Sequence, residues 1–272
     1  MNLIQFFQYK TQTLTCWVNS AYDLNVANFQ DFIKQLESCQ ANLNPNEFNS
    51  KIKLGRGKVK VFEIAQVSLV NKKIVMRQCL RGGLIGKILK NKFLNPALLS
   101  NLVAFIHSEV GSEFAQFRPL TEINNLKYLY DNGLNVPCPI GALVKPTTNR
   151  LFYVGYVATE FIENTINFLE FIKSPNVERE KIIALAFLIG QEAREMLELG
   201  VYHSDFHLGN LLVNPETNEV WIIDFDKSTR FDKSAKELYA IKLIKRFTRS
   251  AQKHEVTELI VRPFCQGIGL DM

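Results

Sequence analysis

A polar segment in the last third of the chain carries the residue types that phosphoryl transfer requires. It reads His203-Ser-Asp-Phe-His-Leu-Gly-Asn210, and a second acidic segment, Ile223-Asp-Phe-Asp226, follows two short apolar stretches. Phosphoryl transfer needs a carboxylate that accepts the proton of the attacking hydroxyl, and Mg²⁺ held against the phosphates. Asp205 is placed to be that carboxylate. Asn210 and Asp224 offer the hard oxygen ligands that Mg²⁺ prefers.

The spacing of these residues follows the kinase pattern H-x-D-x-x-x-x-N followed by D-F-x. A single Asp-x-x-x-x-Asn is common by chance, but here a long apolar-faced segment precedes it and a turn-linked strand pair separates it from Ile-Ile-Asp-Phe. The structural alternative is that Asp205 caps a helix and Asp224 stands in a turn. The conjunction of features favours the kinase interpretation.

Candidate nucleotide-binding residues lie upstream. Gly55 and Gly57 flank Arg56 between two expected strands, where glycines let backbone N–H groups approach phosphates, although a plain hairpin turn fits them equally well. Arg77 ends the strand-like Ile-Val-Met-Arg, at the point where kinases present a lysine to the phosphates, and arginine can clamp a phosphate with two hydrogen bonds. Glu122 shares a helix face with apolar leucines and therefore requires a cation such as Arg77. Each residue has a structural alternative. Arg77 could be an ordinary solvated strand arginine, and Glu122 could be a first-turn glutamate that the helix dipole stabilises.

The pattern of apolar residues predicts the elements that position these side chains. The order of strands plus one helix, followed by a helix-rich half, predicts an α+β chain of two lobes, in which the N-lobe is an antiparallel sheet and the small C-lobe is helical. The kinase pattern of the two polar segments makes a protein-kinase-like fold the expected form of this bilobal chain. Residues 1–49 are expected to form an N-terminal extension, 50–162 the N-lobe and 163–272 the C-lobe. Glu160 and Ile162 end an apolar strand at the expected hinge, where backbone groups of kinases meet adenine. The expected strands are 51–54, 58–66, 73–80, 151–161, 211–213 and 220–223, and the expected helices follow Pro119 or cover 178–199 and 235–249.

Composition bounds the class of protein. Hydrophobic residues make up 47% of the 272 residues, which is enough for a sizeable core and excludes an intrinsically disordered chain. The net charge of +5 fits an anionic substrate or an anionic membrane surface, although a charge this small on a chain of this length fits a protein with neither partner equally well. The five cysteines are widely spaced without a CxxC pair, which argues against a disulfide framework or zinc site. With neither a signal peptide nor an apolar run of about 20 residues, we expect a cytosolic, soluble or peripheral protein.

The motifs, taken in order, resemble those of the 3-deoxy-D-manno-octulosonic acid (Kdo) kinases, within the lipopolysaccharide kinase group of the protein-kinase-like fold. The similarity extends over about residues 50–250. The matching segments are Leu54-Gly-Arg-Gly57, Arg77 to Leu80 with Arg81-Gly-Gly-Leu84, Arg118 with Glu122, Gly133-Leu-Asn-Val-Pro137, Glu160 with Ile162, His203 to Asn210, Trp221 to Lys227, and Lys245-Arg-Phe247.

The resemblance implies transfer of the γ-phosphate of ATP to the 4-OH of Kdo on a Kdo-lipid A precursor. It implies ATP and Mg²⁺ as cofactors, and peripheral attachment to the cytoplasmic face of a Gram-negative inner membrane. It makes Asp205 the catalytic base. The expected magnesium ligands are Asn210 and Asp224, and the expected ATP-binding residues are Gly55, Gly57, Arg77, Glu122, Glu160 and Ile162.

The acceptor is expected to contact a basic, apolar stretch that includes Arg81 and Lys87, unless this stretch is an ordinary solvated helix face. Neither a nucleic acid nor an obligate protein partner is expected.

Two alternatives remain open at this point. The segment from His207 to Asn210 is closer to the H-x-G-N of small-molecule phosphotransferases than to the N-A-H-N of the Kdo kinases, so a sugar or aminoglycoside kinase of the same fold is a candidate. Arg77 in place of lysine suits a pseudokinase that binds nucleotide as a scaffold, although the presence of Asp205, Asn210 and Asp224 opposes it. A protein kinase is disfavoured because no Ala-Pro-Glu follows Asp224.

Overall fold

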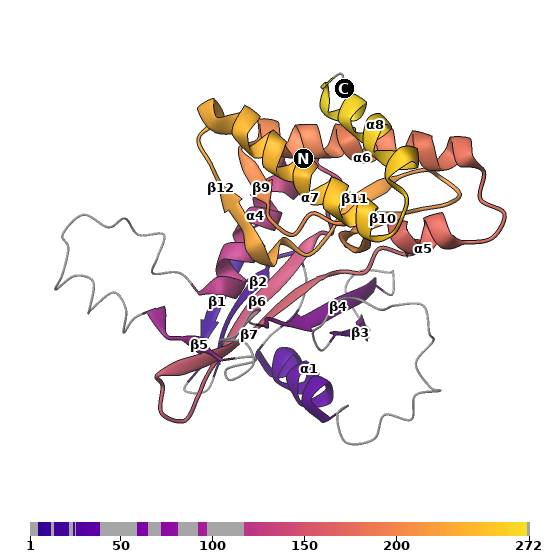
Figure 1. Ribbon diagram of the computed structural model, residues 1–272. Helices are drawn as coiled ribbons and strands as arrows, with labels where there is room; N and C mark the ends of the chain where they lie inside the picture. The colour runs from indigo at the N-terminus through magenta and orange to yellow at the C-terminus, as the bar shows by residue number, and fades with distance from the viewer. Residues whose placement is uncertain are drawn as a thin grey trace. The chain divides into compact units, whose positions relative to one another are not determined.

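A computed structural model describes residues 5–11, 14–21, 24, 26–38, 59–64, 72–80, 92–96 and 117–270 of the chain (Figure 1). The chain divides into two compact units. Unit 1 comprises Met1–Asn124 and Cys138–Phe161, and unit 2 comprises Asn125–Pro137 and Ile162–Met272. An antiparallel sheet dominates the first and helices dominate the second, which confirms the predicted α+β class.

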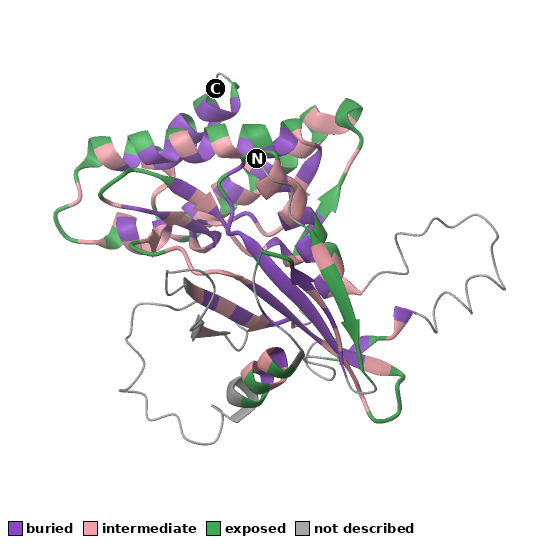
Figure 2. Cartoon of the chain, turned by 180° about the vertical axis from the view of Figure 1, so that it is seen from behind, coloured by how far each residue is buried: buried purple, intermediate pink, exposed green. Residues whose placement is uncertain are grey.

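Unit 1 is built on a seven-stranded sheet in the order β1-β2-β6-β7-β4-β3, with β5 paired to β7. All of its pairings are antiparallel. Strands β6 and β7 are the most deeply buried, as Figure 2 shows, because their apolar residues form nearly continuous runs. The strands are β1 (Phe6–Lys10), β2 (Thr15–Asn19), β3 (Val59–Ile64), β4 (Lys72–Gln78), β5 (Phe93–Leu94), β6 (Pro139–Pro146) and β7 (Phe152–Glu160).

The N-terminal residues correct one prediction. Residues 1–49 were expected to form an extension ahead of the main fold, but β2 pairs with β6 and β1 pairs with β2, so both strands belong to the sheet. Helix α1 (Val26–Ser38) adds Phe29, which is fully buried, to the same core. The sequence pattern does not predict this role, because β2 has only five residues, of which Cys16, Val18 and Asn19 are buried, and they show no clear period of two.

The structure describes only some of the strands predicted around the nucleotide-side residues. The second and third strands of the expected meander are confirmed as β3 and β4, which pair with Val59 opposite Arg77. The first strand, 51–54, lies outside the described residues. The expected helix after Pro119 is α4 (Arg118–Asp131), whose first half belongs to unit 1 and whose second half belongs to unit 2.

Unit 2 consists of helices over two small sheets, β11-β10-β8 and β12-β9. The long helix and the strand pair predicted from the sequence are confirmed as α6, β10 and β11. Within the described residues, no helix is long and apolar enough to cross a membrane. The elements are β8 (Ile166–Asn167), α5 (Phe168–Lys173), α6 (Arg179–Glu198), β9 (Val201–His203), β10 (Leu211–Val213), β11 (Val220–Ile222), β12 (Ser228–Arg230), α7 (Lys236–Lys253), α8 (Thr257–Ile268) and the 3-10 turns η2 (Leu208–Asn210), η3 (Phe225–Lys227) and η4 (Lys233–Ala235).

Helices α6 and α8 touch backbone to backbone. The two α-carbons of Gly190 and Gly267 lie at this crossing, and a Cβ built on Gly190 would stand 2.3 Å from the carbonyl oxygen of Phe264. Short C-terminal helices are expected in this unit, but the sequence predicts no helix bounds beyond residue 249, and Pro263 inside α8 interrupts the sequence pattern of a helix. The close crossing fixes α8, and with it the ring of Phe264, against the remaining helices of the unit.

We expect Gly190→Ala to lower the free energy of unfolding by about 1–3 kcal/mol, because backbone atoms of α8 must move to admit one methyl group. Urea denaturation followed by circular dichroism measures the change. Gln191→Ala is the matched control, since Gln191 is exposed on the same helix and its replacement should change stability by less than about 0.5 kcal/mol. Equal stability of the Gly190 variant and the wild type would contradict the close crossing.

Candidate active site

His203 ends β9 and is fully buried. Its Nε2 donates to the carbonyl oxygen of Ile223 at 3.0 Å, and its Nδ1 accepts from the backbone N–H of Asp205 at 3.2 Å. These two partners assign the neutral tautomer with the proton on Nε2. Burial lowers the pKa of His203, so the ring stays neutral. One side chain therefore links the Asp205 loop to the residue that precedes Asp224.

Asn210 lies beside Asp224 because of the β10–β11 register. Leu211 pairs with Ile222, and the N–H of Ile223 donates to the carbonyl oxygen of Asn210 at 3.0 Å, so Asp224 follows directly. The Asn210 side chain donates through Nδ2 to the backbone oxygen of Asp205 at 3.0 Å. Since the amide nitrogen is used in this way, Oδ1 is the end of the side chain suited to a cation.

Asp224 adopts a left-handed backbone conformation with φ of +65°. This conformation is uncommon outside glycine, and short polar residues such as aspartate tolerate it best. The next residue, Phe225, is buried, and its ring lies 4.9 Å from the ring of His203. The packed phenylalanine thus holds the chain in the turn that orients the Asp224 carboxylate.

Asp205 is flanked by two cations of the same unit. Lys227 Nζ lies 3.3 Å from Oδ2, and Arg246 of α7 forms an ion pair with Oδ1. Partial burial alone would raise the pKa of Asp205, but the charge of Lys227 and the hydrogen bond from Arg246 outweigh it and hold the pKa below its usual value. The carboxylate is therefore ionised at neutral pH.

The carboxylates of Asp205 and Asp224 have common surroundings. Burial lowers the pKa of His207, and the negative charges of both aspartates act on His207 and on His203 in the opposite direction. His207 also fixes the loop, since its Nδ1 accepts from the N–H of Gly209 at 3.1 Å. The structure thus brings together the three oxygen-bearing residues, Asp205, Asn210 and Asp224, that the sequence singled out.

The donor set fits a magnesium site completed by a substrate. No cluster of three or more histidine, cysteine or acidic residues forms a metal site in the part of the chain that the structure describes. Mg²⁺ needs no such cluster, because it is usually held by one or two carboxylates together with phosphate oxygens and water. Asp224 and the Asn210 amide oxygen are the residues that would hold it.

Helix α7 supports the loop from outside. Ser250 Oγ accepts from the N–H of Leu208 at 3.2 Å, one turn after Arg246 on the same helix face. Phe247, between them in sequence, is fully buried and stacks on Phe264 at 3.8 Å. The sequence predicts no site role for Arg246, Ser250 or Lys227. A polar pair four residues apart, flanking a buried phenylalanine, was the available signal.

The nucleotide-side residues of unit 1 include a buried ion pair. Arg77 of β4 contacts Glu122 of α4, whose side chain is only 3% exposed. Glu160 ends β7, where its N–H donates to the carbonyl oxygen of Cys138 at 2.9 Å. Ile162 is the first residue of unit 2 after the division, and its carbonyl oxygen accepts from Thr165 at 2.8 Å. Gly55, Gly57, Arg81 and Lys87 lie outside the described residues.

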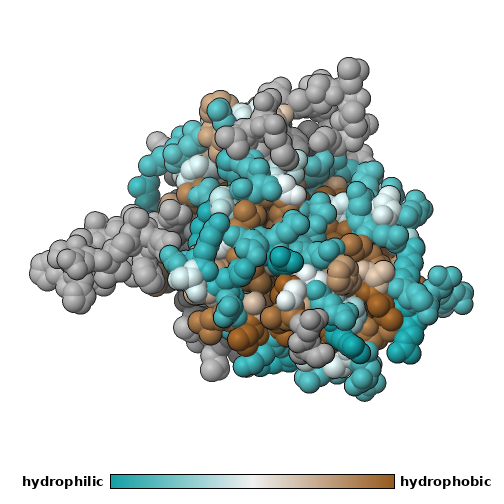
Figure 3. Space-filling view, turned by 90° about the horizontal axis from the view of Figure 1, so that it is seen from above, coloured by the Kyte–Doolittle hydropathy of each residue, from teal (hydrophilic) through white to brown (hydrophobic). Residues whose placement is uncertain are grey.

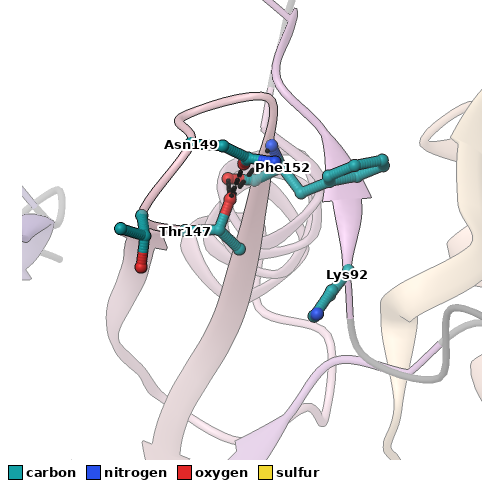
Figure 4. Close-up of a pocket in the computed structure, with 5 residues that line it drawn as sticks. Lys92, Thr147, Asn149 and Phe152 are labelled. Carbon is teal, nitrogen blue, oxygen red and sulfur yellow. Dashed lines mark hydrogen bonds between the residues drawn. The ribbon is translucent and has the colours of Figure 1, made fainter.

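A cavity of about 290 Å³ lies at the turn between β6 and β7 of unit 1 (Figure 4). Lys92, Thr147, Thr148, Asn149 and Phe152 line it. Thr147 Oγ1 lies 2.7 Å from Asn149 Oδ1 and 2.9 Å from the carbonyl oxygen of Phe152. These polar groups therefore close the turn, and none of the predicted site residues lines the cavity.

The sequence model of the Lipopolysaccharide kinase (Kdo/WaaP) family matches residues 58–266 of this chain. The chain belongs to this family. Three curated relatives carry the name 3-deoxy-D-manno-octulosonic acid kinase. That of Mannheimia succiniciproducens is 30% identical over 66% of this chain and 67% of its own length, that of Haemophilus influenzae 28% over 65% and 65%, and that of Vibrio vulnificus 30% over 56% and 55%. The match thus spans between about half and two thirds of each relative, and it confirms the resemblance drawn from the motifs.

A solved structure, that of WaaP in complex with acyl carrier protein, is also similar. It is 12% identical in sequence, with a TM-score of 0.49 over 86% of this chain and 82% of that chain.

We expect His203→Phe to lower turnover by about 10–100-fold, because it keeps an aromatic ring against Phe225 but removes the bonds that position Asp205 and Ile223. Steady-state kinetics of this lipopolysaccharide kinase family member, with thermal denaturation alongside, measures the effect. His254→Phe is the matched control, because His254 lies at the end of α7. Equal turnover in both variants would show that the imidazole bonds do not position the loop.

Proposed function

We propose that the chain transfers the γ-phosphate of ATP to the 4-OH of Kdo on a Kdo-lipid A precursor. The observation that carries the proposal is the joining of Asp205, Asn210 and Asp224 through His203 and the β10–β11 register. Membership of the lipopolysaccharide kinase family and the names of the curated relatives support the acceptor.

In this proposal, Asp205 orients the acceptor hydroxyl and takes its proton as the oxygen attacks the γ-phosphorus. His203 stays neutral and positions the Asp205 backbone. Asp224 and Asn210 would hold Mg²⁺, which would neutralise phosphate charge. The Arg77 guanidinium, oriented by Glu122, binds nucleotide phosphates. Gly55, Gly57, Glu160 and Ile162 remain the proposed contacts to the rest of ATP, and Arg81 and Lys87 the proposed contacts to the acceptor.

We also propose that the protein works at the cytoplasmic face of the inner membrane, where a lipid-linked acceptor lies. Leu238 and Ile241 of α7 are 53% and 48% exposed, and the exposed Lys242 shares their helix face. Figure 3 shows apolar side chains at the surface between hydrophilic ones. Exposed apolar residues beside a lysine suit the boundary of an anionic lipid layer.

Two other functions compete with this proposal. A small-molecule phosphotransferase would use the same loop. The H-x-G-N segment supports this alternative, because the His207 side chain caps η2 by accepting from the N–H of Gly209. A pseudokinase scaffold would bind nucleotide without turnover, but it has no need of an aspartate positioned by a buried imidazole. Incubation with labelled ATP beside a Kdo-lipid A precursor, an aminoglycoside and a generic protein substrate separates the three. A Kdo kinase labels the lipid, a small-molecule phosphotransferase labels the aminoglycoside, and a pseudokinase labels none of the acceptors.

We expect Asp205→Asn to lower kcat by at least about 10³-fold and to leave ATP affinity within a few-fold of the wild type. The reason is that the amide keeps the shape and the hydrogen bonds of the backbone but cannot accept the hydroxyl proton. Phosphotransfer to the Kdo-lipid gives kcat, and calorimetric titration with a non-hydrolysable ATP analogue gives the affinity. Asp226→Asn is the control from the neighbouring acidic segment. Turnover retained in Asp205→Asn would remove the catalytic role.

The double variant Arg77→Gln/Glu122→Gln is expected to weaken ATP binding by about tenfold or more. It removes the phosphate-binding cation without leaving Glu122 buried as an unpaired charge, which would by itself cost about 3–5 kcal/mol. Titration with the ATP analogue measures the affinity. Lys34→Ala controls for the loss of a cation from unit 1, since Lys34 is exposed. Unchanged affinity in the double variant would argue against a nucleotide role for Arg77.

A further inference from the structure

Both oxygens of the catalytic carboxylate face a cation. Lys227 stands at Oδ2 and Arg246 at Oδ1. The two cations come from different elements, η3 and α7, and both reach solvent, since their side chains are 46% and 35% exposed. An exposed ion pair contributes little to stability, so this arrangement needs an explanation other than the fold.

The arrangement opposes the proposed chemistry as it stands. A base must offer a lone pair to the acceptor hydroxyl within hydrogen-bond distance, and two cations compete for the lone pairs of Asp205. Turnover therefore requires that Lys227 and Arg246 pair with another negative group when the acceptor binds.

Arg246 and Lys227 are positioned so that a negatively charged group of an acceptor can contact their side chains. Phe247, stacked on Phe264, and Ser250, bonded to Leu208, fix the turn of α7 that carries Arg246. Ser228 pairs with His203 in the β12–β9 register, and Ser204 Oγ donates to the carbonyl oxygen of Lys227 at 2.8 Å. Both backbones are thus anchored to the Asp205 loop, while both side chains remain long and solvent-accessible.

We propose that Arg246 and Lys227 bind the carboxylate of the acceptor sugar acid, and that this exchange of partners frees Asp205 to accept the hydroxyl proton. The inference rests on the proposed function and extends it, because it names the residues that recognise the acceptor. An arginine fork and a lysine together match the two oxygens of a carboxylate. A neutral sugar would leave the cations on Asp205, so the same pair selects for an acid.

The test compares two water-soluble acceptors, a short alkyl glycoside of Kdo and its carboxamide, which lacks only the negative charge. The wild type is expected to prefer the carboxylate by about 30-fold or more in kcat/KM, as one lost charged interaction implies. Arg246→Ala should reduce this preference to less than about threefold, mainly through a higher KM for the carboxylate. Lys227→Ala should reduce it in the same direction and serves as the second variant if Arg246→Ala folds poorly.

Arg262→Ala is the matched control, since Arg262 is exposed on α8 and its loss should leave the preference unchanged. An equal fall of kcat/KM on both acceptors in the Arg246 and Lys227 variants would overturn the inference, because the cations would then act on Asp205 or on the transferred phosphoryl group. A wild type that phosphorylates both acceptors equally would overturn it as well, while leaving the proposed reaction intact. A wild type that hydrolyses ATP and phosphorylates neither acceptor would instead overturn the proposed function.

Discussion

A neutral imidazole buried inside unit 2 is the constraint on which the site depends. His203 donates from one ring nitrogen and accepts at the other, so a single side chain joins two segments that lie twenty residues apart. A charged imidazole could not accept from the Asp205 N–H, and burial opposes that charged form. Two aromatic residues, Phe206 and Phe225, pack against the imidazole of His203 and exclude water from it. The apolar packing is therefore what preserves the polar geometry.

The same packing extends to the helices. Phe206 of the Asp205 loop lies 6.2 Å from Phe247 of α7 and 5.9 Å from Phe264 of α8, measured between ring centroids. All three rings are fully buried. Arg246 therefore reaches Asp205 from a helix whose position is set by the residue next to it. The close crossing of α6 and α8 at Gly190 and Gly267 fixes Phe264, and Phe247 of α7 stacks on that ring.

The sequence allowed the chemistry-bearing loop to be predicted better than its neighbours. Asp205, Asn210 and Asp224 stand at fixed spacings between strong apolar segments, and local pattern suffices to place such residues. Arg246 lies more than forty residues from Asp205 on a helix with many basic residues, and neither its spacing from Ser250 nor the motif Lys245-Arg-Phe247 identifies Asp205 as its partner. Its partner is set by tertiary packing, which local pattern does not contain.

The fold shows the same division between local and long-range information. Helix α6 and the β10–β11 pair follow periodicity and turn residues, whereas β1 and β2 join the sheet through a partner, β6, more than a hundred residues away. Strand β6 itself escaped the prediction, because the prolines at its two ends, Pro139 and Pro146, interrupt the pattern of a strand. In the structure these prolines stand only at the ends of the strand, where they cost no interior hydrogen bond.

The choice of asparagine at position 210 follows from the geometry. Its Nδ2 donates to the Asp205 backbone oxygen, which a carboxylate could not do, and its Oδ1 remains the end that can face a cation. An aspartate there would also add a third negative charge beside Asp205 and Asp224, at a point where Lys227 and Arg246 already balance the first. A neutral side chain that both donates and accepts therefore holds the loop together without adding negative charge, and it leaves an amide oxygen suited to the cation proposed for this site.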